Sequence, residues 1–341
     1  MTAPADSPFL VAARGGLPSR RPVWFMRQAG RSLPEYLAIR GSGSILEAVR
    51  QPDLATEITL QPIRRYGVDA AILYSDIVVP IAAIGFGVDI QPGLGPVVEM
   101  PFASAQDLAR LRPLEPEVDT PYVLETVRNL VRELTVPLIG FAGAPFTVAS
   151  YLIEGRPSRD YARTKAMMHG DSVLFGQLLE RLAEMALTSL RSQVAEGAQA
   201  VQLFDSWAGA LHPEDYRRHV LPHSRRVLEG VADLAVPRIH FGVSTGELLP
   251  FMAEAGADVV GVDWRVPLDA ARARVGPGYA LQGNLDPAVC AAPWPAVETA
   301  ALDVLRRGGK AGHIFNLGQG VLPQTDPTVL ERLVELVHRE G

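Results

Sequence analysis

The sequence predicts an α/β protein that folds as a single (β/α)8 barrel, and three observations support this. Eight short segments are apolar along their whole length, as strands of a parallel sheet buried on both faces are. Helical patterns lie between these segments through most of the chain. No linker interrupts the 341 residues, and no G-x-G-x-x-G turn follows the first segment, which argues against an open doubly wound sheet.

Composition narrows the functional classes. A hydrophobic content of 48% is sufficient for a large core, and a net charge of −6 argues against a general affinity for nucleic acid. A single cysteine, Cys290, rules out an internal disulfide or a multi-cysteine metal site. We find no signal peptide and no stretch long enough to span a membrane. These features predict a soluble protein of the cytoplasm.

The N-terminal part of the chain divides into an arm and the start of the barrel. Residues 1–20 mix Pro, Gly, Ala and Arg without a period, so we expect a mobile arm, and residues 21–341 form the barrel domain. The segment PVWFMR, 22–27, predicts the first strand, and Gly and Pro in the following residues indicate a loop. Residues 44–66 predict two helical pieces, the second beginning at Pro52.

The remaining elements follow in alternation. After the first strand, strands are predicted at 70–76, 137–143, 200–209, 238–243, 259–264, 279–284 and 313–318. Beyond residue 66, helices are predicted at 120–134, 172–196, 213–230, 245–255, 267–274, 296–307 and 327–339. GVDIQPGLGPVVEM, which follows the second strand, predicts an inserted hairpin with its turn at 92–96.

Polar residues follow the predicted strands. The carboxyl ends of barrel strands meet on one face, which carries the chemistry in this fold. This rule gathers Arg27, Asp76, Tyr151, Ser206, Asn284 and the segment NLGQG on that face.

Arg27 and Arg31 are the strongest candidates for binding an anion. Between them, Gln28 supplies an amide, and Ala29 and Gly30 allow main-chain N–H groups to approach a ligand. Salt bridges to neighbouring loops are the structural alternative, but the flexible spacer at a strand end favours a ligand.

Other chemistries have weaker support. Ser206 follows Asp205 but has no histidine in its motif, so a Ser-His-Asp site is not indicated. His219 and His223 lie four residues apart, but Pro222 interrupts their face and arginines surround them, so we interpret this segment as a solvated basic surface. No metal or cofactor is predicted.

Six segments resemble the uroporphyrinogen decarboxylase family, and the resemblance extends over essentially the whole chain. They are PVWFMRQAGRSLPEY (22–36), ILYSDI (72–77), GFAGAPFTVASYLIEG (140–155), QLFDSWAG (202–209), LQGNLDP (281–287) and FNLGQG (315–320). The first of these, which contains both candidate arginines, is highly specific to the family.

The resemblance implies a homodimeric (β/α)8 barrel that uses no cofactor or metal. The resemblance also implies that the enzyme would remove the four acetate carboxyl groups of uroporphyrinogen III to give coproporphyrinogen III. By motif, Arg27 to Arg31 would bind substrate carboxylates and Asp76 would bind the pyrrole N–H groups. Tyr151 and Ser206 would line the site.

The last motif departs from the family pattern NLGHG because Gln319 replaces the histidine. Glutamine binds a carboxylate but cannot become cationic or relay a proton, so we expect Gln319 to bind substrate only. Arg27 is the preferred proton donor, with Tyr151 and an ordered water as alternatives.

Two other functions are alternatives for this sequence. A zinc-dependent, corrinoid-linked methyltransferase of the same barrel superfamily needs cysteine and histidine ligands, and this chain has one cysteine. A non-enzymatic tetrapyrrole-binding protein would bind the macrocycle without releasing CO2.

Overall fold

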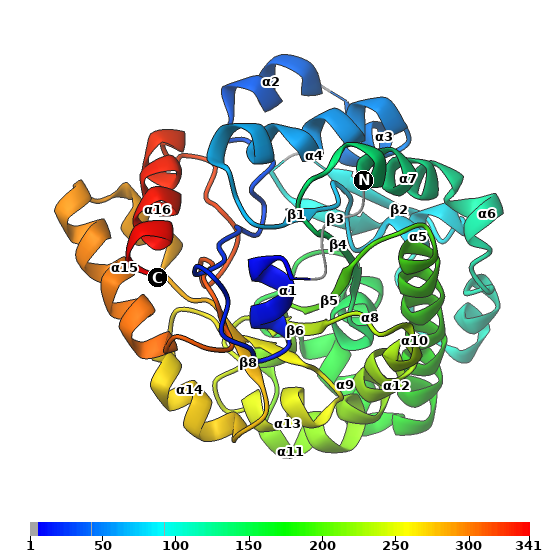
Figure 1. Cartoon of the computed structure of the whole chain (residues 1–341). Helices are drawn as coiled ribbons and strands as arrows, with labels where there is room; N and C mark the ends of the chain where they lie inside the picture. The colour runs from blue at the N-terminus through cyan, green and yellow to red at the C-terminus, as the bar shows by residue number, and fades with distance from the viewer. Residues whose placement is uncertain (1–5, 42, 92) are drawn as a thin grey trace.

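The computed structural model describes residues 6–41, 43–91 and 93–341. A curled parallel sheet of seven strands forms its centre, in the order β1-β4-β5-β6-β7-β8-β9, and helices surround it (Figure 1). The strands are β1 (Ala71–Ile72), β4 (Leu138–Gly143), β5 (Ala200–Asp205), β6 (Arg238–Gly242), β7 (Val259–Gly261), β8 (Ala280–Gln282) and β9 (His313–Ile314). The α/β class and the parallel sheet are thus as predicted.

Helices connect the strands. The α-helices after the N-terminal segment are α2 (Pro34–Arg40), α3 (Ile45–Val49), α4 (Pro52–Tyr66), α5 (Val79–Ala83), α6 (Pro116–Asp119), α7 (Pro121–Glu133), α8 (Pro145–Glu154), α9 (Ala162–Gly170), α10 (Ser172–Ala195), α11 (Pro213–Asp215), α12 (Leu221–Glu229), α13 (Leu249–Glu254), α14 (Leu268–Val275), α15 (Trp294–Gly308) and α16 (Pro327–Glu340). Shorter turns are the 3-10 helices η1 (Ala105–Arg110), η2 (Ala208–Ala210), η4 (Ala232–Leu234) and η5 (Pro287–Ala291), and the π-helix η3 (Tyr216–Val220).

The first predicted strand is not a member of the regular sheet. Residues around Val23 form one parallel bridge to Phe315, beyond the end of β9, and the carbonyl of Val23 accepts a hydrogen bond from the N–H of Asp69 (2.8 Å). The side chain of Asp69 in turn accepts a hydrogen bond from the N–H of Val23 (2.9 Å). The segment therefore lies between the two edges of the sheet, although too few residues pair to make a strand.

The expected mobile arm is wrong for the described part of residues 1–20. Ser7 caps helix α1 (Pro8–Ala13), which buries Phe9 and Leu10. The carbonyl of Gly16 accepts a hydrogen bond from the N–H of Gly312, just before β9 (3.0 Å). Helix α1 therefore covers the N-terminal ends of the strands, and Figure 1 shows it in front of the centre of the helical ring. Residues 1–5 lie outside the described residues.

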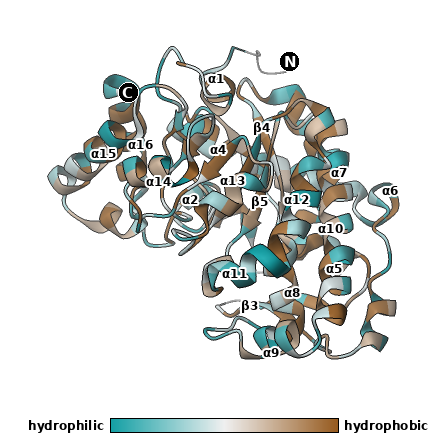
Figure 2. Ribbon diagram, turned by 90° about the horizontal axis from the view of Figure 1, so that it is seen from below, coloured by the Kyte–Doolittle hydropathy of each residue, from teal (hydrophilic) through white to brown (hydrophobic). Residues whose placement is uncertain are grey.

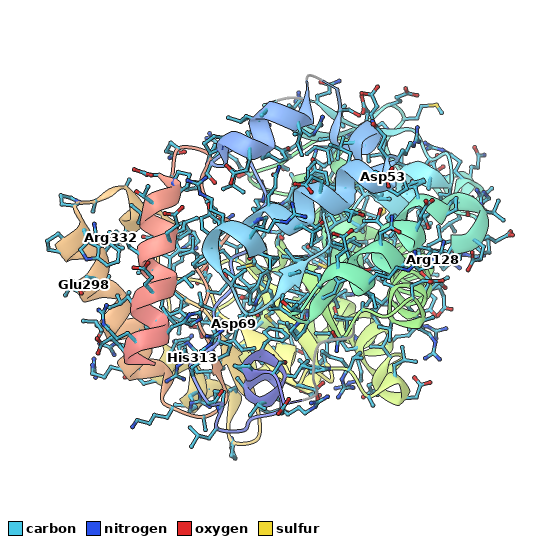
Figure 3. All side chains as sticks on the ribbon, turned by 45° about the horizontal axis from the view of Figure 1, so that its top comes forward. Asp53, Asp69, Arg128, Glu298, His313 and Arg332 are labelled. Carbon is cyan, nitrogen blue, oxygen red and sulfur yellow. The ribbon has the colours of Figure 1, made fainter. Side chains whose placement is uncertain are left out.

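Buried polar side chains fix this N-terminal end. Asp69, just before β1, accepts hydrogen bonds from Arg20 (2.7 Å) and faces His338 of α16 (2.7 Å). His313 is fully buried, and its Nε2 lies 2.9 Å from the carbonyl oxygen of Gly283. Burial lowers the pKa of His313 to about 3, so its ring is neutral. Figure 3 shows Asp69 and His313 on the same side of the molecule as α1.

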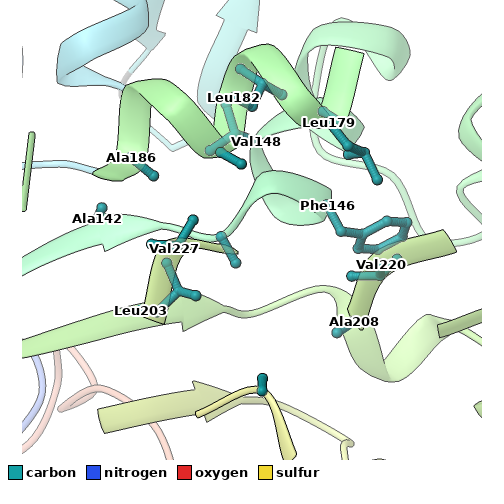
Figure 4. Packing of buried hydrophobic residues seen from close by; sticks show 14 of the residues in the cluster. Ala142, Phe146, Val148, Leu179, Leu182, Ala186, Leu203, Ala208, Val220 and Val227 are labelled. Atoms are coloured by element: carbon teal, nitrogen blue, oxygen red, sulfur yellow. The ribbon is translucent and has the colours of Figure 1, made fainter. Parts of the chain in front are cut away.

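Apolar packing between the sheet and its helices forms the core. Figure 4 shows part of it, where Phe146 and Val148 of α8 and Leu179 and Leu182 of α10 gather near Leu203 of β5. Burying each such side chain contributes roughly 1.5–3 kcal/mol. This packing fixes β4 and β5 in register, with Ile139 opposite Ala200 and Gly143 opposite Phe204.

Two strands lie outside the parallel sheet. β2 (Val88–Gln91) pairs antiparallel with β3 (Gly95–Val98), between α5 and η1 in the chain. In Figure 2, β3 lies with α8, α9 and α11 on the side opposite α1, which is the side where the parallel strands end. Among the described residues, no helix is both long enough and apolar enough to cross a membrane.

Candidate functional site

The candidate site lies where the parallel strands end. Asp76 follows β1, Tyr151 lies in α8 after β4, and Ser206 follows β5. Arg27 follows the Val23 segment and Gln319 follows β9. Because the strands are parallel, these five residues share one end of the sheet, as the sequence predicts.

Arg27 and Arg31 are exposed, and neither forms an ion pair with any residue that the structure describes. Arg27 has a positive φ of 59°, which is unusual for a residue with a side chain. Its side chain passes over Gly320, where an added Cβ would lie 2.6 Å from the Arg27 Cδ. The salt-bridge alternative therefore finds no partner, and both guanidinium groups remain available to an anion.

Main-chain N–H groups add to this positive surface. Within the described chain, the N–H groups of Ala29, Gly30 and Arg31 donate to no protein acceptor. Free N–H groups beside arginines are well suited to bind a carboxylate. The expected roles of Ala29 and Gly30 thus match what their backbone offers.

The side chain of Gln28 corrects one expectation. It is fully buried, its Oε1 accepts a hydrogen bond from the N–H of Phe25 (3.1 Å), and its Nε2 donates to the carbonyl of Ala70 (3.2 Å). The amide is therefore occupied within the protein and is not free to donate to a ligand. Gln28 instead fixes the turn that presents Arg27 and Arg31.

Asp76 supplies the negative charge of the site. It is partly buried, and its Oδ1 accepts a hydrogen bond from the N–H of Val78 (3.1 Å). Burial raises the pKa of Asp76, while the N–H groups of Val78 and Ile77 and the positive charge of Arg27 oppose that rise. The hydrogen bond from Val78 orients the carboxylate just before α5, so a local capping role and a ligand-binding role are compatible.

Tyr151 lies within electrostatic reach of both charged groups. Burial raises its pKa above the usual value, the charge of Asp76 raises it further, and the charge of Arg27 lowers it. The phenol is therefore protonated at neutral pH and can donate a hydrogen bond. The structure thus brings together the three predicted residues Arg27, Asp76 and Tyr151.

An aromatic wall, formed by Tyr151, Trp207 and Tyr161, extends the site. The ring centroids of Tyr151 and Trp207 are 3.8 Å apart, and those of Tyr161 and Trp207 are 5.0 Å apart. Sequence reasoning did not select Trp207 or Tyr161. The position of Trp207 beside Ser206 was an available signal, whereas nothing near Tyr161 in the chain indicated this contact.

A buried hydrogen-bond network holds Trp207 of the aromatic wall in place. The hydroxyl of Thr147 donates to Asp205 (2.9 Å) and accepts a hydrogen bond from the N–H of Trp207 (3.2 Å). The other oxygen of Asp205 lies 3.7 Å from Nε2 of His240, and both side chains are fully buried. Asp205 and His240 therefore point into the interior, and no Ser-His-Asp relay forms at Ser206.

The last motif reaches the site through its backbone. Asn316 accepts a hydrogen bond from the N–H of Met26 (3.2 Å), and the N–H of Val321 donates to the carbonyl of Met26 (2.9 Å). These bonds hold the segment against the residue that precedes Arg27. Gln319 is exposed next to Gly320, so its amide can reach a ligand held by Arg27.

Cavity size does not identify this site. A cavity of about 570 Å³ lies at the N-terminal ends of the strands, where Ala13, Ala232 and Tyr279 line it. It contains none of the predicted residues. We place the functional site at the other end because the unpaired arginines and the partly buried carboxylate are there.

One group of side chains in the described residues has the spacing of metal ligands. It consists of His169, Asp215 and His219, which lie outside the aromatic wall. His223, which the sequence places near His219, faces Glu180 instead, with Nδ1 3.4 Å from the carboxylate. His219 and His223 therefore lie in two different environments, whereas the sequence predicts one solvated face.

The family model and the relatives similar in sequence agree on one family. The model described as uroporphyrinogen decarboxylase (URO-D) matches residues 4–340. The uroporphyrinogen decarboxylase of Salinispora tropica is 63% identical over 337 residues, covering 98% of this chain and 91% of that protein. That of Streptomyces coelicolor is 61% identical over 341 residues, covering 99% of this chain and 96% of that protein.

Solved structures resemble the chain in fold alone. A methyltransferase from Methanosarcina mazei has a TM-score of 0.81 at 19% identity, and the match covers 99% of both chains. A B12-independent methionine synthase from Shewanella has a TM-score of 0.57 at 14% identity, covering 85% of this chain and 88% of that one.

Proposed function

This chain belongs to the uroporphyrinogen decarboxylase family, and we propose from that premise how its residues decarboxylate uroporphyrinogen. The reaction replaces the four acetate arms of uroporphyrinogen III by methyl groups, giving coproporphyrinogen III and CO2. The observation that carries the assignment of roles is the position of two unpaired arginines beside one partly buried carboxylate.

Different residues bind the edge and the centre of the macrocycle. Arg27, Arg31 and the N–H groups of Ala29 and Gly30 bind the peripheral carboxylates. Asp76 accepts hydrogen bonds from the pyrrole N–H groups at the centre. The aromatic wall contacts the rim of the macrocycle, and Ser206 and Gln319 bind further carboxylates.

Catalysis requires an electron sink that the substrate itself provides. Protonation of a pyrrole ring makes it cationic, the bond between the acetate CH2 and its carboxylate breaks, and the electron pair moves into the ring. CO2 leaves, a proton adds to the methylene carbon, and the ring proton is released, so each arm gains one proton and loses one CO2. The charge of Asp76 stabilises the cationic ring, an effect that is strong in a partly buried site.

Arg27 donates the proton in this proposal, and Arg31 positions the substrate. Arginine is a weak acid, so this role requires the bound macrocycle to exclude water from Arg27, which is exposed in the free protein. Arg27→Lys should reduce kcat much more than substrate affinity, and Arg31→Lys should reduce affinity more than kcat. Equal losses of kcat and affinity in Arg27→Lys would leave Tyr151 or an ordered water as the donor.

The two rival functions predict different observations. A zinc-dependent methyltransferase needs thiolate ligands, and the one cysteine, Cys290, is buried with its pKa raised to about 12 by burial. The Methanosarcina methyltransferase shares the fold with this chain, at 19% identity. A tetrapyrrole-binding protein without activity would bind uroporphyrinogen and leave its carboxyl groups intact.

Anaerobic incubation of the purified protein with uroporphyrinogen III tests the activity. Products are oxidised to porphyrins and separated by their number of carboxyl groups. We expect seven-, six-, five- and four-carboxyl products in the presence of a chelator. Recovery of only the eight-carboxyl porphyrin would contradict the assignment.

Three finer features belong to the same proposal. The segment around Val23 completes the sheet as the eighth member of a (β/α)8 barrel, the pair β2 and β3 is the hairpin inserted after the second member, and the protein is a cytoplasmic homodimer. Hydrogen bonds from the Val23 region to Phe315 and Asp69 support the first feature. Sedimentation equilibrium of the purified chain tests the dimer.

A further inference from the structure

Two histidines differ from the other five of this chain. Each of the five has a ring nitrogen within 3.4 Å of a polar atom of a residue that is not a histidine: His212, His223, His240, His313 and His338. His169 and His219 instead make no hydrogen bond with the described residues. They lie against each other, with ring centroids 6.2 Å apart and planes at 83°.

A carboxylate completes this arrangement. Nε2 of His169 lies 3.6 Å from Oδ2 of Asp215, and one ligand atom from each of His169, Asp215 and His219 lies within 4.8 Å of the other two. Atoms bound to zinc at about 2.0–2.1 Å in a tetrahedron are about 3.4 Å apart. His169 is exposed, so its side chain is free to move toward Asp215 and His219 when a cation binds.

We propose that His169, Asp215 and His219 form a binding site for a first-row divalent cation of the zinc type. Two imidazole nitrogens and one carboxylate oxygen suit zinc, nickel or copper, whereas magnesium and calcium prefer oxygen ligands. Water occupies the remaining coordination positions, since the site faces solvent.

The surrounding charges limit the ligand set to these three residues. Glu214 is paired with Arg217 and lies outside the group of three ligand atoms. The positive charge of Arg218 acts on His219 and opposes cation binding. The charges at the site therefore predict a moderate affinity for the cation. Acidic charge alone does not account for binding here, so the two imidazoles are needed.

The position of the site gives it a structural role. His169 lies near the end of α9, which begins directly after Tyr161, and Asp215 ends α11, which follows Trp207 through η2. His219 lies in the π-helix η3, an element that often occurs at functional positions. A bound cation therefore joins two segments that lead from the aromatic wall, without contacting the reacting atoms.

Zinc binding to the full-length protein tests the proposal. The protein is first treated with chelator, then titrated with Zn²⁺ in a calorimeter, and a parallel series uses Mg²⁺. We expect one saturable equivalent of Zn²⁺, no competition by millimolar Mg²⁺, and a higher melting temperature with Zn²⁺. His169→Ala should weaken binding at least tenfold and abolish the thermal shift.

A matched variant separates this site from other surface histidines. His212→Ala removes an exposed imidazole outside the cluster and should keep both the binding and the thermal shift. Asp215→Asn should weaken binding while circular dichroism reports an unchanged fold. Absence of saturable Zn²⁺ binding, or equal binding by wild type and His169→Ala, would overturn the proposal.

Discussion

The negative charge of Asp76 can be removed while its shape is kept, by the change Asp76→Asn. A hydrogen bond from the N–H of Val78 (3.1 Å) orients its side chain, and an amide oxygen accepts that bond as well as a carboxylate does. The variant therefore tests the charge and leaves the local geometry in place. In the proposed mechanism, this negative charge stabilises the cationic pyrrole ring.

The expected loss of activity follows from Coulomb's law. Opposite unit charges about 4 Å apart interact with about 4 kcal/mol at the effective dielectric constant of roughly 20 that suits protein sites. Only charge that develops in the transition state lowers the barrier, and losing one such preorganised group costs about 100- to 1000-fold in kcat. We expect a loss of that size for Asp76→Asn.

The same change should not reduce stability. Burial raises the pKa of Asp76 in the folded protein above its unfolded value. The folded state then holds more protons, so this group costs stability as pH rises from about 4 through the folded pKa, and the cost persists at neutral pH. Asp76→Asn removes the cost, so its free energy of unfolding at pH 7 should equal or exceed that of the wild type.

Two measurements check this reasoning. Initial rates of CO2 release from uroporphyrinogen III give kcat, and urea denaturation gives the free energy of unfolding. Asp326→Asn is the control, because Asp326 is exposed and also accepts a hydrogen bond from an N–H two residues later (2.9 Å). A wild-type kcat in Asp76→Asn would refute the electrostatic role, and a large loss of stability would refute the burial argument.

Three further predictions concern the supports of the site and the opposite end of the sheet. Gly320→Ala places a methyl group 2.6 Å from the Arg27 Cδ, so kcat/KM should fall several-fold while the melting temperature stays within a few degrees of the wild type. Thr147→Val removes the hydrogen bond to buried Asp205 and should lower the free energy of unfolding in urea by about 1–3 kcal/mol; an unchanged value would mean that the network contributes nothing. His313 is neutral in the fold with a pKa of about 3, so stability should fall by about 1.4 kcal/mol per unit as pH drops below about 6, and His313→Gln should flatten that dependence.

Local pattern was sufficient for much of the fold. The amphipathic period predicts a helix at 172–196, and the structure has α10 at Ser172–Ala195, with Asp171 as its cap. Apolar segments predict β4 and β5, and the first of them places Tyr151 beyond its end. These features depend on residues near each other in the chain, so the sequence displays them directly.

Local pattern failed where distant contacts decide the outcome. The segment PVWFMR has strand composition, yet it forms only one bridge, between Val23 and Phe315. The number of residues that pair depends on the segments packed beside it, not on its own composition. The residues before it look irregular, yet α1 forms because Phe9 and Leu10 find an apolar surface at the strand ends.

By itself, the sequence determined the parallel α/β architecture, the family and the residues that carry charge at the strand ends. Periodicity, composition and motif are properties of the chain, so they needed no tertiary structure. Only the tertiary structure decided that the Gln28 amide is buried and occupied, that Trp207 and Tyr161 extend Tyr151, and that His169 meets His219. Each of these contacts involves residues that are separated in the chain, and only the packing of the folded protein brings them together.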